Sequence, residues 1–134
     1  MNAKPFLDTN ILIYAFAQGD RRTAAAVSLV ESGGVISVQI LNEFVNVSRK
    51  KLGRGWDEIE HQLRVIRNLF GPALSLEPGH HQLAVSIAKR FGFGIFDSLM
   101  VASAAIANCD TLYTEDLHHG QIIEGLTICN PFTS

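Results

Sequence analysis

The chain has 134 residues, of which 47% are hydrophobic and 18% charged, and its formal net charge is −2. This length suits a single domain, 1–134, that buries roughly two-thirds of its unfolded surface, and the composition excludes a disordered tail. No apolar run reaches the ~18 residues that a membrane span requires, and two cysteines are too few for a disulfide scaffold or a zinc site. Since no signal-peptide pattern opens the sequence, we expect a cytoplasmic protein that does not involve a membrane.

Short apolar, strand-like segments alternate along the chain with segments of helical periodicity. Strands are predicted at 4–8, 35–38, 73–76, 111–114 and 126–129. Helices are predicted at 10–17, 21–32, 39–52, 57–70, 79–91 and 97–108. Strands interleaved with helices imply βαβ units, so we predict an α/β fold of three layers, in which helices flank a mainly parallel sheet of four to five short strands.

The basic and acidic residues are unevenly distributed. Residues 1–90 contain all 11 Lys and Arg residues of the chain, whereas residues 91–134 contain acidic residues and no Lys or Arg. A uniformly basic protein would indicate bulk nucleic-acid binding. This distribution favours instead a local basic surface that faces an acidic centre, with basic groups holding a polyanion and acidic groups holding a metal.

Four acidic residues stand where predicted elements begin, end or present an edge: Asp8, Glu43, Asp97 and Asp116. Ligands of open parallel sheets bind outside the carboxyl ends of the strands, and carboxylates gathered there repel one another unless a hard cation neutralises them. Mg²⁺ prefers such oxygen ligands. Each residue alone also has a simpler interpretation, because the three aspartates could be helix or turn caps and the glutamate a solvated helix edge.

The order and context of these acids resemble the PIN-domain ribonucleases over nearly the whole chain. The segments that carry the resemblance are FLDTNILIYA with Asp8 and Asn10, SVQILNEF with Glu43, IFDSLMVASA with Asp97, and LYTEDL with Thr114 and Asp116. The final NPF after the last predicted strand is similar to the VapC branch, the toxins of type II toxin–antitoxin pairs. The resemblance implies a PIN-like fold and an active rather than an inactive relative, since every acidic position is retained.

A metal-dependent mechanism follows from these residue types. Mg²⁺, or Mn²⁺ in its place, lowers the pKa of a bound water and neutralises charge on a phosphodiester. We expect Asp8, Asp97 and Asp116 to be the metal ligands, directly or through waters, with Glu43 holding a second metal or orienting the attacking water. The oxygens of Asn10 and Thr114 are expected to support these ligands from outside.

The resemblance also implies products and partners. It implies RNA cleavage that leaves a 5′-phosphate and a 3′-hydroxyl, a homodimer, and a VapB-type antitoxin whose basic side chain enters the acidic site.

The densest basic group lies at the end of the predicted helix that carries Glu43. It comprises Arg49, Lys50, Lys51 and Arg54. It is interpreted either as an RNA-phosphate grip or as cations that complement the helix dipole. Lys50 lies seven residues after Glu43 and is expected on nearly the same face. Trp56 is interpreted as a partly buried anchor at the entry of the next helix, with base stacking as the alternative.

Three other functions remain open. A haloacid-dehalogenase-type phosphatase needs a second Asp where this chain has Asn10. A receiver domain has a similar Mg²⁺ pocket but needs a Lys after a late strand, and no Lys follows Lys89. A non-catalytic RNA-binding module is disfavoured by four acids, which repel phosphate without a metal.

Overall fold

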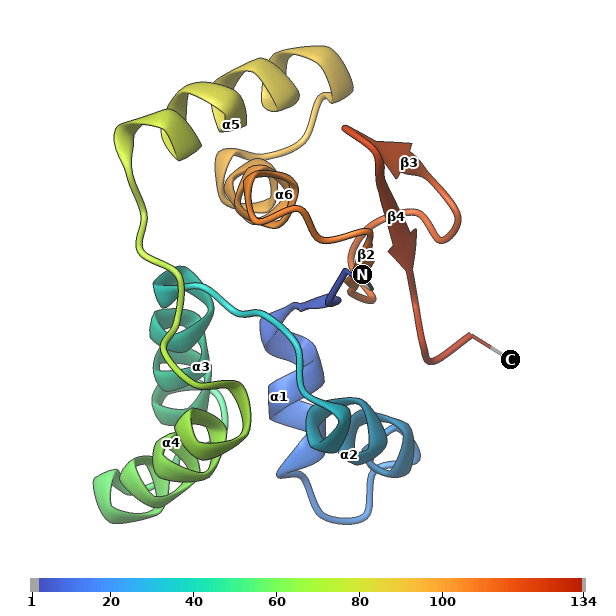
Figure 1. The fold of residues 1–134 in the computed structure, drawn as a ribbon. Helices are drawn as coiled ribbons and strands as arrows, with labels where there is room; N and C mark the ends of the chain where they lie inside the picture. Colours follow the sequence, from blue (N-terminus) through green and yellow to red (C-terminus); the bar gives the residue numbers. More distant parts are fainter. Residues whose placement is uncertain (1–2, 134) are drawn as a thin grey trace.

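The computed structural model describes residues 3–133 and contains ten helices and strands within them (Figure 1). The helices are α1 Thr9–Ala15, α2 Thr23–Ser32, α3 Val38–Lys50, α4 Trp56–Phe70, α5 Pro78–Phe91 and α6 Ile95–Ile106. The strands are β1 Phe6–Leu7, β2 Thr111–Tyr113, β3 Ile122–Ile123 and β4 Leu126–Cys129.

The sheet has the order β1-β2-β4-β3, in which β1, β2 and β4 are parallel and β3 is antiparallel to β4. Two isolated parallel bridges, Phe6↔Val35 and Ser37↔Leu74, extend it beyond β1. Strand β1 therefore lies in the interior of the sheet, between β2 and the segment that contains Val35. The approach of residues 34–35 to β1 requires glycine at Gly34, because a Cβ there would stand 2.6 Å from the carbonyl oxygen of Pro5 and φ is +154°.

Helices cover both sides of the sheet. In Figure 1, α5 and α6 lie above it, and α1, α2, α3 and α4 lie below it. The uncharged segment of α6 is buried around Met100, Val101 and Ala104, and α1 inserts Ile11 and Leu12 into the core on the other side. This arrangement confirms the prediction of a three-layer α/β fold with a mainly parallel sheet.

Most helices and strands were predicted correctly from the sequence, and the differences concern short strands and the first residues of helices. The strands predicted at 35–38 and 73–76 are present only as the two isolated bridges, and the antiparallel strand β3 was not predicted. In residues 3–133, no helix combines the length and the apolar composition that a membrane crossing requires.

Candidate active site

Asp8 lies directly after β1 and caps helix α1. Its Oδ1 accepts a hydrogen bond from the backbone N–H of Thr9 at 2.6 Å, and its Oδ2 accepts one from the hydroxyl of Thr114 at 2.7 Å. The side chain is 5% exposed. The capping interpretation of Asp8 is therefore correct, and it does not exclude a second role, because Oδ2 faces the end of β2.

Thr114 and Asn10 join Asp8 to Asp116. The hydroxyl oxygen of Thr114 accepts a hydrogen bond from the backbone N–H of Asp116 at 3.0 Å. The Asn10 amide nitrogen donates to Oδ2 of Asp8 at 3.3 Å and to Oδ2 of Asp116 at 3.2 Å. Asn10 was expected to support the carboxylates through its oxygen. In the structure it contacts both carboxylates through its amide nitrogen instead. Thr114 is fully buried and supports both aspartates.

Glu43 reaches the same place from α3. Its Oε2 accepts a hydrogen bond from the hydroxyl of Thr9 at 3.1 Å, and its Oε1 accepts one from Nε2 of Gln39 at 2.7 Å. Nε2 of Gln39 also donates to the carbonyl oxygen of Phe96 at 3.0 Å, which ties α3 to the start of α6. Thr9 and Gln39 were not predicted as site residues from the sequence. The spacing of four residues between Gln39 and Glu43 was the available signal, since such residues are neighbours on a helix.

Asp97 is the third residue of α6, which begins at Ile95 after the capping residue Gly94. The interpretation of Asp97 as a helix cap is therefore wrong, because the segment Ile95-Phe96 already has helical geometry. A carboxylate in the first turn still benefits from the partial positive charge of the helix N-terminus. Asp97 is half-buried beside the Phe96 carbonyl that Gln39 contacts.

The four carboxylates influence one another. The pKa of Asp8 is raised to about 7, mainly by burial; the hydrogen bonds from Thr114 and Thr9 oppose this increase, and the charges of Asp116 and Glu43 add to it. Burial also raises the pKa of Asp97, and Asp116 and Glu43 again contribute by repulsion. Such mutual repulsion at a sheet edge is typical of a site that awaits a counter-charge.

Three of the carboxylates line one hollow of about 370 Å³, here called the acidic hollow. Its lining comprises Asp8, Thr9, Asn10, Ile13, Tyr14, Glu43, Val47, Lys51, Leu52 and Asp116. Asp97 is outside this lining but close enough to share the field of Glu43 and Asp116. The structure thus brings together the four acids that the sequence singled out, although they come from four separate parts of the chain.

A family model described as the PIN domain matches residues 6–123 of this chain. The chain belongs to the PIN domain family. Its fold is similar to that of a toxin–antitoxin complex from Klebsiella pneumoniae, with 23% identity, a TM-score of 0.70, and 96% of this chain and 98% of that chain covered. A VapBC complex from Rickettsia felis bound to a DNA fragment from its promoter matches with 20% identity, a TM-score of 0.67, and 92% and 96% of the two chains covered.

A third similar PIN structure is a sarcin–ricin-loop-cleaving VapC toxin from Mycobacterium tuberculosis. It is 14% identical, with a TM-score of 0.64 and 84% and 91% of the two chains covered. At these identities the structural likeness establishes the fold. A search of the curated proteins found none that matches this chain.

The donor set of this PIN domain fits a hard cation. The buried Oδ1 of Asn10 and Oε1 of Gln39 have no hydrogen-bond partner, which leaves two further oxygens unpaired beside the carboxylates. Within residues 3–133, no group of three His, Cys, Asp or Glu side chains is arranged to hold a metal ion directly. Mg²⁺ usually keeps several waters and binds through one or two carboxylates, so carboxylates spaced by hydrogen-bond donors suit it.

The basic group divides between two surfaces. Lys51 lines the acidic hollow, whereas Arg49 and Lys50 line a neighbouring hollow with Trp56. Lys51, rather than Lys50, thus lines the hollow that contains Glu43. Arg54 donates through Nη1 to Oε1 of Gln62 at 3.2 Å and to the hydroxyl of Ser48 at 3.4 Å, so it also holds the α3–α4 turn.

Tyr14 forms one wall of the acidic hollow and anchors the segment after β2. Its hydroxyl donates to Glu115, and the guanidinium of Arg22 stands 3.8 Å from the centre of its ring. Arg22 also pairs with Glu115 at 3.4 Å and with Asp20 at 2.9 Å. Glu115 is half-buried in this network, directly beside Asp116 in sequence.

Proposed function

We propose that this PIN domain is an Mg²⁺-dependent endoribonuclease that acts as the toxin of a toxin–antitoxin pair. The observation that carries the proposal is the convergence of Asp8, Glu43, Asp97 and Asp116. Burial, together with repulsion from Asp116 and Glu43, raises the pKa of Asp8 and of Asp97. Such a site lacks the counter-charge that a hard cation supplies. The fold is also shared with a structure described as a toxin–antitoxin complex.

The carboxylates of Asp8, Asp97 and Asp116 would hold Mg²⁺ or Mn²⁺, directly or through waters. When bound, such an ion lowers the pKa of a coordinated water and neutralises charge on a phosphodiester. Water attacks the phosphorus, the bond from phosphorus to the 3′ oxygen breaks, and the products are a 5′-phosphate and a 3′-hydroxyl. Glu43 is fixed through both of its oxygens by Thr9 and Gln39, so it is placed to orient the attacking water.

The cations at the end of α3 would bind the RNA backbone. Lys51 lines the acidic hollow and is placed to contact the phosphates beside the scissile bond. Arg49, Lys50 and Arg54 would extend this contact away from the hollow. Each Lys or Arg that neutralises a phosphate adds affinity that falls with salt concentration.

The proposed partners follow from the same charge pattern. A hollow lined by three carboxylates attracts a basic side chain, and a VapB-type antitoxin that inserts one there would occupy the position of the cation. Complexes of this fold with antitoxins support this partner. We propose a homodimer as the unit that binds it.

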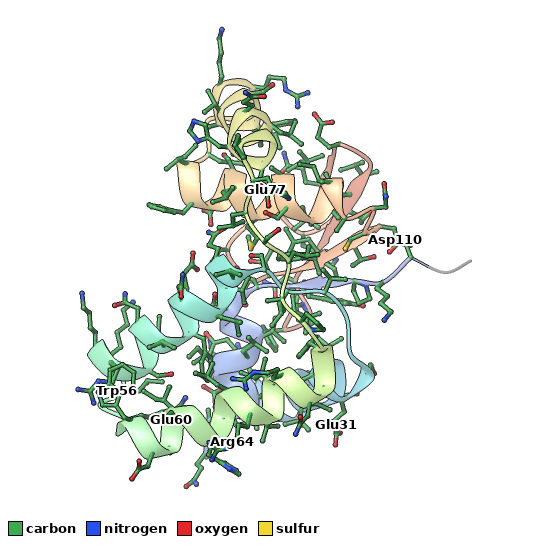
Figure 2. The ribbon with its side chains drawn as sticks, turned by 60° about the vertical axis from the view of Figure 1, so that its left-hand side comes forward. Glu31, Trp56, Glu60, Arg64, Glu77 and Asp110 are labelled. Carbon is green, nitrogen blue, oxygen red and sulfur yellow. The ribbon has the colours of Figure 1, made fainter. Side chains whose placement is uncertain are left out.

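Cleavage of labelled RNA in Mg²⁺, compared with the same reaction in EDTA, tests the catalytic proposal. Asp8→Asn and Asp97→Asn should each lower the rate by more than the roughly 10- to 100-fold typical of residues that support a metal ligand. The matched control is Asp110→Asn, because Asp110 is exposed and lies at the opposite side of the molecule from Trp56 and α3 (Figure 2). Wild-type cleavage by Asp8→Asn, or equal cleavage in EDTA, would contradict the proposal.

The toxin role is tested separately in a bacterial host. Expression of the chain alone should arrest growth, and co-expression of the small protein encoded beside it should relieve the arrest. Asp8→Asn should be harmless at the same level of soluble protein. Normal growth with active, soluble protein would refute the toxin role and leave the nuclease proposal standing.

A further inference from the structure

Trp56, the single tryptophan of the chain, is 54% exposed at the first position of α4. Figure 2 shows it at the far end of the α3–α4 pair, away from the core. The expectation of a partly buried anchor is therefore wrong. About half of the residue is open to solvent, so a ligand that covers the indole would bury a large apolar area.

One face of the Trp56 ring is held by an arginine. The guanidinium carbon of Arg49 stands 4.8 Å from the ring centre, and Nη1 of Arg49 donates to the carbonyl oxygen of Arg54 at 3.0 Å. The arginine is thus fixed between helix α3 and the turn. This contact orients the indole and leaves the rest of it exposed, which is the geometry of a preformed stacking platform.

Apart from Val45, the residues that surround Trp56 are polar or basic. Together with Asn42, Val45, Asn46, Arg49 and Lys50 it lines an open hollow of about 550 Å³, here called the Trp56 hollow. Among these lining residues, all within the described part of the chain, there is no carboxylate. Asn42 and Asn46 are exposed one helical turn apart, and their amides offer both donors and acceptors to the edge of a base.

The Trp56 hollow and the acidic hollow lie on two sides of the second half of α3. Asn42, Asn46 and Lys50 line the first, while Glu43, Val47 and Lys51 line the second. A helix with its side chains is about 10–12 Å across, so one extended strand can contact both hollows. The consecutive lysines at 50 and 51 then stand where its backbone would cross the helix.

We propose that the Trp56 hollow binds an unpaired nucleobase of the RNA substrate, stacked on the indole. The proposal rests on the nuclease function proposed above and adds that the bound RNA is single-stranded on this side of α3. A base in a duplex has its faces covered by its neighbours, whereas an unpaired base has a free face for an aromatic ring. The positive charge of Arg49 and Lys50 suits the phosphates attached to that base.

The single tryptophan makes the test direct, because fluorescence of the wild-type chain reports on Trp56 alone. The probe is a single-stranded oligoribonucleotide of about 12 nucleotides, within the usual range for single-strand sites. It is added in EDTA, so that binding is measured without cleavage. The two comparison probes are the same strand annealed to its complement and an abasic ribose-phosphate strand of equal length. We expect strong quenching by the single strand and weak quenching by the other two.

Variants supply the second measurement. Trp56→Ala should weaken binding of the single strand roughly 5- to 150-fold, which corresponds to the stacking of one base, without altering the salt dependence. Lys50→Ala should instead lower the slope of log affinity against log salt by roughly one unit. The matched control is Phe91→Ala on α5, where Arg90 also lies over an exposed aromatic ring, at 5.3 Å, and where RNA affinity should not change.

Three results would each overturn the inference. They are equal quenching by the abasic strand, unchanged affinity of Trp56→Ala, and Trp56 emission that responds only to an added protein partner. The quenching experiment needs no variant, so misfolding cannot explain its outcome. Failure of the proposed nuclease function would give a different result: the protein would not cleave RNA in Mg²⁺, but the single strand would still quench Trp56 in EDTA.

Discussion

At the scale of single residues, Asp8 shows how one carboxylate serves the fold and the site together. One oxygen caps α1 and the other accepts hydrogen bonds from Thr114 and Asn10. Burial nevertheless raises its pKa to about 7 in the metal-free protein. The ionised form of Asp8 is therefore destabilising until a cation is bound, so the fold tolerates this residue at a cost in stability.

This cost predicts a pH effect on the metal-free protein. The folded-state pKa of Asp8, about 7, lies above its unfolded value, so the folded state binds more protons between about pH 4 and pH 7. Stability should therefore fall as the pH rises through this window. Asp8→Asn removes the titrating group and preserves a good helix cap. At pH 7 the variant should be more stable, by up to a few kcal/mol, because one pKa unit corresponds to about 1.4 kcal/mol.

Urea denaturation in EDTA at several pH values measures this effect. The difference in unfolding free energy between Asp8→Asn and the wild type should grow from low to neutral pH. Asp110→Asn, at an exposed position, is the control and should show no such trend. A variant that is much less stable than the wild type at pH 7 would mean that Asp8 acts mainly as a structural cap.

At the scale of elements, Tyr14 links three segments of the chain. From α1 its hydroxyl reaches Glu115 after β2, its ring face meets Arg22 at the start of α2, and the ring of Phe132 packs against it with centres 5.3 Å apart. Burial and the bond to Glu115 raise the pKa of Tyr14 to about 12. The hydroxyl thus remains a donor at physiological pH and holds the segment that carries Asp116.

This link predicts a measurable coupling between Tyr14 and Glu115. Tyr14→Phe and Glu115→Gln should each destabilise the protein, and the double variant should lose less than the sum, with a coupling of about 1 kcal/mol. The measurement is a double-mutant cycle by urea denaturation. Tyr113→Phe is the control, because the Tyr113 hydroxyl makes none of the side-chain hydrogen bonds found in residues 3–133. Full additivity of the two changes would show that the contact contributes nothing to stability.

At the scale of the whole molecule, the site depends on elements that meet only through the sheet. β1 pairs with β2, and the side chains that follow these strands meet at one edge, where α3 and α6 add Glu43 and Asp97. A ligand that binds only this assembled site stabilises the whole fold by mass action.

Mg²⁺ or Mn²⁺ should therefore raise the melting temperature of the wild-type protein. Saturation to 100 times the dissociation constant corresponds to about 2.7 kcal/mol of stabilisation. Asp116→Asn should lose most of this increase, because it removes a charge from the acidic hollow. Asp110→Asn should retain it. Thermal denaturation across a metal titration gives the result, and an equal increase in both variants would place the ion elsewhere.

The sequence predicted the parts of this site that depend on local context. Asp8, Asp97 and Asp116 could be found because each follows a strand or starts a helix, and Glu43 because it borders an apolar stripe. The bond from Thr9 to Glu43 and the Tyr14 network could not, since their partners lie far away in sequence and depend on how helices pack. The two-residue strand β3 and the presence of Lys51 in the acidic hollow also depend on tertiary contacts, which outweigh local preference.

The interior position of β1 bears on how the protein folds. Phe6 of β1 pairs with Leu112 of β2, which lies far along the chain. The N-terminal strand must wait for most of the chain, and long-range pairings of this kind form slowly. Because Asp116 lies in the segment after β2, its carboxylate meets that of Asp8 only when β1 and β2 have paired. The acidic hollow therefore forms late in folding, as a product of this long-range pairing.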